Sequence, residues 1–563
     1  MLRFDWSKVF LILIIGLVSY LVLGPILLLI AGSFTSGRPG DFTSFSLNNY
    51  VEAYYNLKTL EFFLNSLVFA AGSMFIGLSV AIIFAWLIER TNTPLRNVAY
   101  VLVISPMAIP GMLLSIAWVF LLSSRIGILN QILMKIFGLS HAPFNIFSLY
   151  GMIFVEGLRL VPTTFLLLVG AFRSMDPALE EAAYASGANT LTVTRRITLK
   201  VLMPSILVAG IYIFMTAIEA FEIPGILGIP ARIFVFSSRI FFATHSGGIP
   251  EYGIANSLAI TYLALSIFLI WIYQRKTRHA ERFVTVTGKA YRPRVIDLGR
   301  WRYLGLVFFI VYFLLTVLFP MLILFWASLL PFYQIPSQEA LSLVSLDAYR
   351  EALDNFQVQT AIKNTLILMV ESAFITTALA VIVAWIVVRS KFIGRKVLDI
   401  LTFLPHAIPS IVIGLALTYV YLTLDFIPIY ATSWILLVAL VTKYMAFSTR
   451  TLNAAIIQIH TELEEAAKVS GASWGRILLK IIVPLLLPTV IGVAIWVVVH
   501  AMREVSMCLM LNSPGNIVLS VLIWVYWDGG NHAIACALGV LLVLAVIFLT
   551  VIGRVLGTRY AIR

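Results

Sequence analysis

Apolar segments of about 20 residues recur along the whole chain, and they constrain its fold more than any other feature. A helix of that length crosses a bilayer. The segments lack the alternation of apolar and polar residues that the strands of a transmembrane barrel require. The composition, with 61% hydrophobic and 12% charged residues and a mean hydropathy of +0.99, also excludes a soluble protein. We therefore predict an all-α polytopic membrane protein.

About twelve transmembrane helices are expected, six in each half of the chain. The first apolar segment is too long for a signal peptide and is not followed by a convincing cleavage site, so we interpret it as an uncleaved helix. The predicted spans are 9–31, 60–88, 98–123, 148–173, 201–225, 252–274, 303–329, 361–388, 398–424, 432–450, 483–511 and 531–555.

The net charge of +13 is concentrated on one predicted face of the membrane. The segment 275–302 alone holds nine Lys or Arg residues against two acidic residues. Cytoplasmic loops carry an excess of Lys and Arg, so this segment and both termini are predicted to be cytoplasmic. No nucleic-acid partner is expected, because no folded soluble segment could bind one.

A short charged segment occurs twice. "LEEAAYASGA" at 179–188 returns as "LEEAAKVSGA" at 463–472, which is 284 residues later. Between 180–204 and 464–488, ten of 25 aligned positions are identical. Both copies stand between long apolar segments, so we expect the segment at matching places in the two halves.

Upstream of this segment the halves align at an offset of 299 residues instead. "SPMAIP" at 105–110 then matches "LPHAIP" at 404–409, and Arg90 matches Arg389. The change of offset means that the first half holds about 15 additional residues, which we place in the predicted extracytoplasmic loop 124–145.

Six spans in each half make both halves enter and leave on the same face of the membrane. The halves are therefore predicted to be parallel, pseudo-symmetric repeats related by an axis along the membrane normal. The expected domains are a first half at 1–274, a basic cytoplasmic linker at 275–302 and a second half at 303–563.

Each repeated segment predicts a short helix, a glycine turn and a second helix. Asp176 and Thr461 are suitable N-caps for the first helices. Gly187 and Gly471 end these helices, because glycine adopts the left-handed conformation without a steric penalty. The second helices have Asn189 and Ser473 as N-caps. The acidic residues and alanines between cap and glycine form a small, smooth surface suited to docking into a groove.

Both segments resemble the EAA loop in the membrane subunits of bacterial ABC importers. That pattern is Glu-Ala-Ala, three residues, Gly, nine residues, Ile, one residue and Leu-Pro. "EEAAYASGANTLTVTRRITLKVLMP" and "EEAAKVSGASWGRILLKIIVPLLLP" keep Glu-Ala-Ala, Gly and Ile. The first departs from the pattern at Lys200, where proline is expected, and the second has Val483 for leucine.

The resemblance implies a type I importer permease with two fused halves in a bacterial cytoplasmic membrane. In that family each EAA loop forms a coupling helix that sits in a cleft of an ATPase subunit. The coupling loops 176–204 and 461–488 therefore imply two ATPase copies, and a periplasmic or lipid-anchored binding protein would deliver the substrate. The residues to which the resemblance gives a coupling role are Glu180, Glu181, Ala182, Ala183, Gly187, Glu464, Glu465, Ala466, Ala467 and Gly471.

The chain contains no G-x-x-x-x-G-K-[ST] segment and hence no phosphate-binding loop of its own. We therefore expect a transport subunit rather than an enzyme, with ATP and Mg²⁺ bound on the partner ATPase. Cys508 and Cys536 offer neither metal-ligand spacing nor a disulfide framework. No catalytic residue, metal site or cofactor is expected in this chain.

Charged residues inside the predicted spans need a reason, because a charge near the bilayer centre costs about 2.5–3.5 kcal/mol on insertion scales. Span five holds Glu219 and Glu222, and span eleven holds Arg503 and Glu504. Arg503 matches Glu219 at the offset of 284, so matched positions carry opposite charges. A salt bridge between the halves, a place along the translocation path and exposure at the outer headgroups are the three interpretations.

Arg159 and Lys443 also match at the offset of 284, each in the span before a coupling loop. We place them with the four residues above along the translocation path. Glu156 lies three residues before Arg159 on the same helix face and is expected to pair with it.

The fused twelve-span arrangement most resembles the permeases of ferric-iron uptake systems. The segments "AIEAFEIPGILGIPARIFVFSSRIFF" and "AMREVSMCLML" resemble matching parts of those permeases. Thiamine, polyamine, phosphonate and oxyanion importers share the architecture and are the alternatives. A secondary transporter is a remote alternative, because it does not explain two EAA loops.

Overall fold

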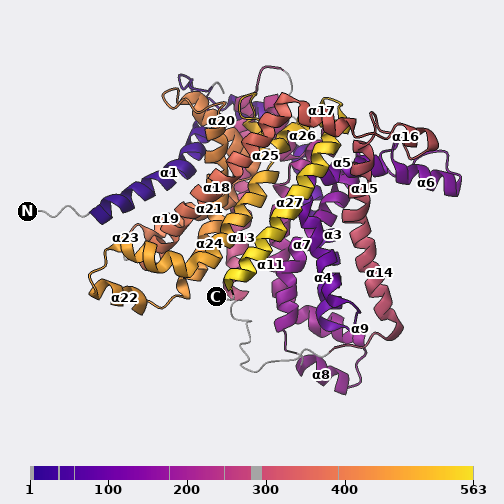
Figure 1. Cartoon of the computed structure of the whole chain (residues 1–563), viewed down its shortest axis with the longest axis horizontal. Coiled ribbons are helices and arrows are strands. Elements are labelled where there is room, and N and C mark those ends of the chain that lie inside the picture. Colours follow the sequence, from indigo (N-terminus) through magenta and orange to yellow (C-terminus); the bar gives the residue numbers. More distant parts are fainter. Residues whose placement is uncertain are drawn as a thin grey trace, which may run out of the picture. The chain divides into compact units, whose positions relative to one another are not determined.

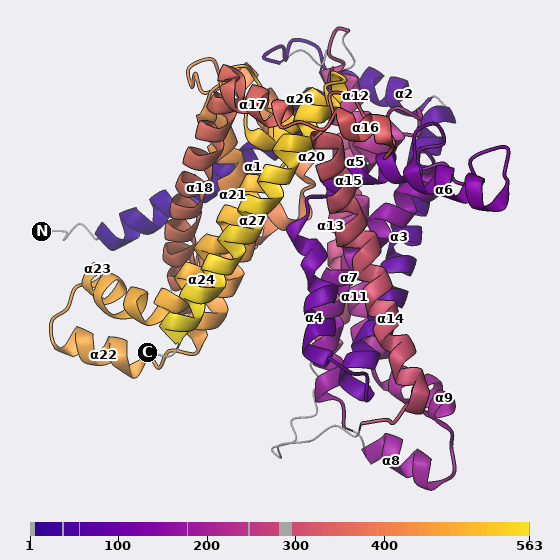
Figure 2. The same cartoon turned by 45° about the vertical axis from the view of Figure 1, so that its right-hand side comes forward.

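A computed structural model describes residues 6–35, 39–55, 57–176, 178–245, 248–280, 295–390 and 392–561. Within these ranges the regular structure is helical (Figure 1 and Figure 2). The only β-type pairing among the described residues is an isolated bridge between Thr91 and Ile296. The prediction of an all-α chain is confirmed. The middle of the predicted linker, 281–294, lies outside the described residues.

Nine of the predicted spans are helices or helical runs that are long and apolar enough to cross a membrane, counted over the described residues. They are α1 (Trp6–Ser33), α3 (Leu57–Arg90), α7 (Leu149–Ser174), α13 (Tyr252–Ala280), α14 (Arg302–Phe313) continued by η6 (Leu314–Leu318) and α15 (Phe319–Ser328), α18 (Phe356–Arg389), α21 (Ser433–Ile457), α23 (Trp474–Ile477) continued by η8 (Leu478–Ile482) and α24 (Val483–Arg503), and α27 (His532–Ala561).

The other three predicted spans are helix pairs with sharp bends, which the sequence did not predict. They are α4 (Arg96–Ile104) with α5 (Gly111–Leu122) at 97°, α9 (Thr190–Val193), η2 (Thr194–Thr198) and α10 (Leu199–Val201) with α11 (Met203–Ile218) at 68°, and α19 (Arg395–Phe403) with α20 (Ser410–Thr423) at 109°. Counting each pair as one span gives the predicted twelve.

The first and third bends fall at the repeated segments "SPMAIP" and "LPHAIP". Proline lacks a backbone donor and pushes the preceding residue out of the helical conformation. Ile109 and Ile408, each followed by a proline, are accordingly extended. The repeat therefore encodes a break at the same place in both halves.

The chain forms two compact units, and each takes segments from both halves of the sequence repeat. Unit one consists of Met1–Asn56, Ile240–Leu263 and Leu346–Arg563, and unit two of Leu57–Arg239 and Ala264–Ser345. In unit one, α1 packs on α19 and α20. In unit two, α14 and α15 pack on α4 and α5. The first span of each half thus packs on helices of the other half, so the domains predicted at 1–274 and 303–563 describe the sequence repeat.

The centre of unit two is the contact between α3 and α7. A methyl group on Gly157 would lie 2.7 Å from the side chain of Ile76, so glycine permits this close approach. In unit one, α18 corresponds to α3 and packs against α21 and α24, as α3 packs against α7 and α11. Both central helices end at an arginine, Arg90 in α3 and Arg389 in α18.

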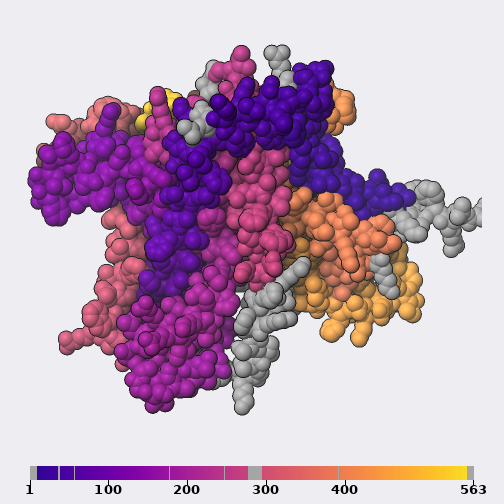
Figure 3. All heavy atoms as spheres, turned by 180° about the vertical axis from the view of Figure 1, so that it is seen from behind, coloured from indigo at the N-terminus to yellow at the C-terminus, as the bar shows by residue number. Residues whose placement is uncertain are grey.

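The predicted insertion in the first half is confirmed. The connection between α5 and α7 covers 26 residues, 123–148, and contains α6 (Ile128–Phe137), whereas the connection between α20 and α21 covers nine, 424–432. In Figure 3 the longer connection projects from its unit. The other short helices are α2 (Asn48–Tyr54), α8 (Ala178–Ala185), α12 (Phe236–His245), α16 (Gln338–Ser342), α17 (Asp347–Asp354), α22 (Glu462–Val469), α25 (Ser506–Met510) and α26 (Leu519–Asp528).

Candidate functional site

The first coupling loop has the predicted form of a helix, a glycine turn and a second helix. The Asp176 side chain accepts a hydrogen bond from the backbone N–H of Ala178 at 2.9 Å, at the start of α8. Gly187 follows with a φ of +84°. The Asn189 side chain then accepts a hydrogen bond from the N–H of Thr192 at 2.8 Å and caps α9. The predicted caps and the left-handed glycine are confirmed here.

The second coupling loop keeps the glycine but uses different caps. Gly471, with a φ of +78°, follows α22. Thr461 has helical dihedral angles, so its carbonyl oxygen accepts hydrogen bonds from the N–H groups of Glu464 and Glu465, at 3.0 and 3.1 Å. Neither Thr461 nor Ser473 makes a side-chain capping bond to a described residue. The prediction of side-chain caps was wrong for this loop.

The two acidic residues of each coupling helix have different environments. Glu180 and Glu464 are only 2% and 3% exposed, whereas Glu181 and Glu465 are exposed. The interpretation of all four as one docking surface was therefore wrong for the buried pair. The exposed surface is formed by Glu181, Ala182, Glu465 and Ala466, with Ala183 and Ala467 half-buried and Leu179 and Leu463 exposed beside them.

Glu180 forms the first buried ion pair, with Arg90 at the end of α3. Arg90 Nη1 lies 3.6 Å from Glu180 Oε2, and its Nη2 donates a hydrogen bond to the carbonyl oxygen of Met175 at 3.0 Å. The Thr198 hydroxyl donates to Glu180 Oε1 at 2.5 Å. The pair therefore fixes both helices of the first loop to the end of α3.

Glu464 forms the second buried ion pair, with Arg389 at the end of α18. Arg389 Nε donates a hydrogen bond to Glu464 Oε1 at 2.8 Å. Its Nη2 donates to the carbonyl oxygen of Ile456 at 3.0 Å and also to that of Ile459. These carbonyls belong to the end of α21 and the turn after it, so this pair ties three segments of unit one together.

The sequence contains a signal for these pairs that we did not recognise. Arg90 and Arg389 are identical at the offset of 299, and Glu180 and Glu464 are identical at the offset of 284. The insertion lies between the arginine and the glutamate of the first half, so the change of offset separated two positions that are neighbours in space. An opposite-charge pair retained in both halves was the available clue.

The segment after Arg90 is paired with the end of the linker. Ile296 N–H donates to the carbonyl oxygen of Arg90 at 2.8 Å, and Asn92 N–H donates to that of Ile296 at 3.0 Å. The backbone N–H of Gly299 and the Asn92 side chain donate to Asp297, and these hydrogen bonds lower the pKa of its carboxyl group. The linker end is thus attached beside the first buried ion pair.

A second group of charged residues in unit two surrounds the bend between α4 and α5. Arg159 donates two hydrogen bonds to Glu156, at 2.8 and 2.6 Å, which confirms the predicted pair. Glu222 Oε2 accepts a hydrogen bond from the N–H of Met112 at 2.8 Å. A methyl group on Gly111 would lie 2.5 Å from Glu222 Oε2 and 3.1 Å from Arg159 Cδ. Arg159 and Glu222 therefore both lie against the start of α5, next to Gly111.

The matched residues Arg159 and Lys443 both lie at the bend of a broken span. Lys443 Nζ donates a hydrogen bond to the carbonyl oxygen of Ile408 at 2.8 Å, at the bend between α19 and α20. A broken helix inside a membrane leaves backbone groups that need partners. Lys443 satisfies one such group in unit one, and Glu222 satisfies one in unit two by accepting from Met112. Arg159 adds a basic side chain near the second of these breaks.

Glu219, Arg503 and Glu504 lie at helix ends, whereas the apolar pattern predicted them inside spans five and eleven. Glu219 follows α11, Arg503 ends α24 and Glu504 follows it. Glu504 accepts hydrogen bonds from Tyr444 Oη and the N–H of Met507, both at 3.2 Å. Glu219 belongs to unit two and Arg503 to unit one. The predicted approach of these two side chains therefore stays a prediction.

A family model described as "Binding-protein-dependent transport system inner membrane component" matches residues 73–281 and 376–561. The chain is 27% identical to a protein of Haemophilus influenzae that is named as a ferric transport system permease, over 89% of this chain and 77% of the relative. It is 26% identical to the ferric transport system permease protein of Actinobacillus pleuropneumoniae, over 85% and 68%. It is 28% identical to the sulfate transport system permease protein of Escherichia coli, over 44% of this chain and 92% of the relative.

Proposed function

This chain belongs to the family of binding-protein-dependent transport system inner membrane components, and we propose that α8 and α22 couple it to two copies of an ATPase subunit. It is a multi-pass permease subunit of an ABC importer. The observation that carries the proposal is the pair of buried Arg–Glu contacts, which fix a helix with an exposed glutamate, alanine and leucine to each central helix.

We assign the binding and hydrolysis of ATP to the partner ATPase subunits. Since this chain has no phosphate-binding loop, the ATPase subunits bind ATP and Mg²⁺. A periplasmic or lipid-anchored binding protein delivers the substrate at the opposite membrane face. Both termini and the linker lie in the cytoplasm with α8 and α22, in accordance with the concentration of Lys and Arg in the linker.

Each unit contains a continuous mechanical route from its coupling loop to its bent span. In unit two the first buried ion pair joins α8 to α3, α3 packs on α7, and α7 carries Arg159 to the bend before α5. In unit one the second pair joins α22 to α18, α18 packs on α21, and α21 carries Lys443 to the bend before α20. A movement of the ATPase pair would therefore reach both bends and switch the path between two states.

We propose ferric iron as the cargo. Support comes from relatives named as ferric transport permeases, which align over 85% and 89% of this chain. Sulfate is the second candidate, because a sulfate permease aligns over 44% of the chain. The basic residues Arg159, Lys443 and Arg503 would also suit an anion.

A deletion strain separates these cargoes. Uptake of radioactive iron from a ferric donor and uptake of radioactive sulfate are measured in the parent, in the deletion strain and after restoring the gene. We expect the deletion to abolish the iron signal alone and the gene to restore it. Loss of sulfate uptake with unchanged iron uptake would move the assignment to sulfate. Loss of thiamine, polyamine or phosphonate uptake alone would overturn both assignments.

The charges at the helix ends line or gate the path in this proposal. Reversing Arg503 alone to Glu is expected to impair uptake, because it places like charges together if Glu219 lies near. Reversing both, with Glu219→Arg and Arg503→Glu, is expected to restore part of the activity. A double-mutant cycle without coupling, in protein that is folded and bound to the ATPase, would show that the two residues act separately.

A further inference from the structure

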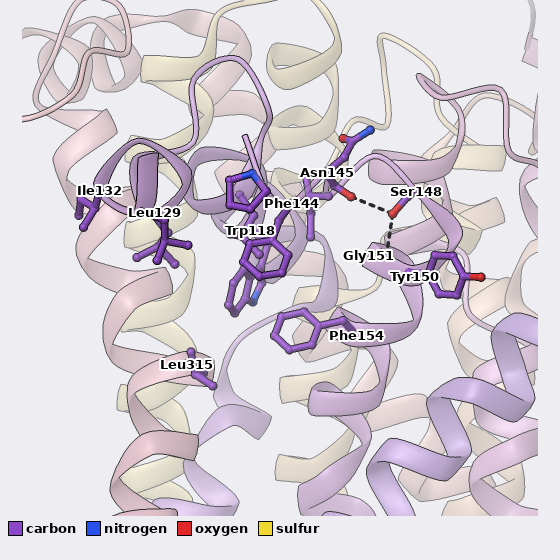
Figure 4. A pocket seen from close by; sticks show the side chains of 14 residues that line it. Trp118, Leu129, Ile132, Phe144, Asn145, Ser148, Tyr150, Gly151, Phe154 and Leu315 are labelled. Carbon is purple, nitrogen blue, oxygen red and sulfur yellow. Dashed lines mark hydrogen bonds between the residues drawn. The ribbon is translucent and has the colours of Figure 1, made fainter. Parts of the chain in front are cut away.

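A cavity of about 650 Å³ lies under the connection between α5 and α7 in unit two (Figure 4). Its wall includes Trp118 of α5, Leu129 and Leu133 of α6, Phe154 of α7 and Leu315 of η6. The volume falls within the range of about 300–1,000 Å³ that is typical of small-molecule pockets. The cavity belongs to the insertion of the first half, and none of the transport steps proposed above uses it.

The wall formed by α6 is held in place by Asn130, which is 1% exposed. Its Nδ2 donates hydrogen bonds to the carbonyl oxygens of Leu122 and Phe144, both at 2.9 Å, and its Oδ1 accepts one from the N–H of Phe144 at 3.2 Å. These bonds tie the start of α6 to the end of α5 and to the segment that returns toward α7. These buried hydrogen bonds therefore hold the α6 wall of the cavity in a fixed position.

The cavity extends from the outer end of unit two into the depth of the membrane. Tyr150 and Phe154 lie within the first six residues of α7, at the end opposite to α8. Leu315 lies 13 residues from either end of the helical run 302–328, which is roughly 20 Å at about 1.5 Å per residue. Since the hydrocarbon core of a bilayer is about 30 Å thick, this part of the wall lies within it.

The cavity is apolar and open at the protein surface. Ile132 and Tyr150 line it and are 46% and 82% exposed. At its rim the Ser148 hydroxyl accepts a hydrogen bond from the N–H of Gly151 at 3.1 Å and donates one to the carbonyl oxygen of Asn145 at 2.8 Å. An apolar cavity does not hold water well, and its lining gains dispersion contacts only from an apolar occupant. The adjoining bilayer supplies such an occupant as acyl chains.

The charges of the connection that covers the cavity indicate the headgroup. The connection and the residues next to it, 122–150, contain Arg125, Lys135 and His141 but no aspartate or glutamate, and these three residues are exposed. We propose that the cavity binds one acyl chain of an anionic phospholipid of the outer leaflet, with the headgroup beside these basic residues. The bound chain would brace α6 against η6 and α7.

Photo-crosslinking tests this site in the full chain reconstituted into lipid nanodiscs. Phosphatidylglycerol with a diazirine at the end of one acyl chain is the probe, and crosslinked residues are identified by mass spectrometry of peptides. We expect crosslinks at Trp118 and Phe154. Leu133→Trp fills the cavity and should lower this labelling about tenfold, a change that corresponds to about 1.4 kcal/mol.

The matched control is Ile136→Trp, which makes a similar change one turn farther along α6, where Ile136 is 67% exposed and does not line the cavity. It should leave labelling at Trp118 and Phe154 unchanged, and both variants should retain labelling of the exposed Val307 on α14. Labelling of Val307 without labelling of the cavity residues would overturn the proposal, as would equal cavity labelling in both variants. Equal labelling by a phosphatidylcholine probe would overturn the choice of an anionic headgroup.

Discussion

The two coupling loops each bury one glutamate against the arginine at the end of a central helix, but they stabilise the carboxylate differently. In the first loop Glu180 accepts a hydrogen bond from Thr198 at 2.5 Å, and Arg90 lies at 3.6 Å. In the second loop Glu464 accepts a hydrogen bond from Arg389 at 2.8 Å. The position that matches Thr198 is Ile482, which has no hydroxyl group.

This difference indicates that the repeat retains the tie between loop and central helix while the hydrogen bonds around it vary. Nε and Nη1 of Arg90 make no hydrogen bond to any described residue, although Arg90 is fully buried. Arg389, by contrast, donates to the glutamate and to two carbonyl oxygens. The first loop therefore depends on its arginine less than the second loop does.

The largest expected effect is that of Arg389→Ala. It leaves the carboxylate of Glu464 buried without its charged partner, and breaking such a buried pair costs about 3–5 kcal/mol. We expect a large fall in the thermal unfolding midpoint and loss of ATP-driven uptake in proteoliposomes. Lys396→Ala is the control, because Lys396 is an exposed basic residue of the neighbouring helix α19. An equal fall in both variants would remove the assigned role of the second pair.

Arg90→Ala should have a smaller effect, because Thr198 still donates a hydrogen bond to Glu180. The expected order is that Arg389→Ala lowers the unfolding midpoint more than Arg90→Ala. Combining Arg90→Ala with Thr198→Val should bring the first loop close to the level of Arg389→Ala. A larger effect of Arg90→Ala alone would reverse the comparison.

Thr198→Val alone removes a hydrogen bond to a charged group, which contributes about 1.5–3 kcal/mol. Thr194→Val is a matched control on the same turn, since the buried Thr194 hydroxyl makes no hydrogen bond to a described residue. The unfolding midpoint should fall for the first variant and change little for the second. The same midpoint for both would show that the contact of Thr198 with Glu180 adds no stability.

Substituting Gly187 or Gly471 with valine is expected to have the smallest effect of these changes. The loss of ATPase binding should be the same for both loops. A Cβ atom added at Gly187 or Gly471 would meet no atom within 4 Å, so a substitution costs only backbone strain. At φ values of +84° and +78° that strain is about 1–2 kcal/mol for valine. Asparagine, which tolerates this conformation better, is the control. ATPase binding should weaken in the valine variants more than in the asparagine variants, and unequal losses would mean that the loops differ in their turns as well.

Local sequence signals were sufficient to predict much of the secondary structure of this chain. The length of the apolar segments predicted the spans, and the offset change predicted the insertion that contains α6. Asp176 and Asn189 cap as their side-chain chemistry predicts. These features depend on residues that lie close together in the chain.

The remaining features depend on contacts that local patterns do not contain. Arg90 and Glu180 are 90 residues apart in the chain, and Arg389 and Glu464 are 75 residues apart, so neither pair follows from helix spacing. The prolines at two of the bent spans were a signal for a break that we did not use, and they do not determine the angles of 97° and 109°. The packing of α1 on α19 and α20 likewise has no signal in the alignment of the two halves.

The central claim is that each coupling loop holds one ATPase subunit, and native mass spectrometry of the purified complex tests it most directly. The intact chain should carry two ATPase copies. Leu179→Asp and Leu463→Asp each place a charge on the exposed surface of one coupling helix, where these leucines are 57% and 48% exposed, without changing a buried ion pair. Each single variant should carry one ATPase copy and the double variant none. Two copies retained in the double variant would contradict the account.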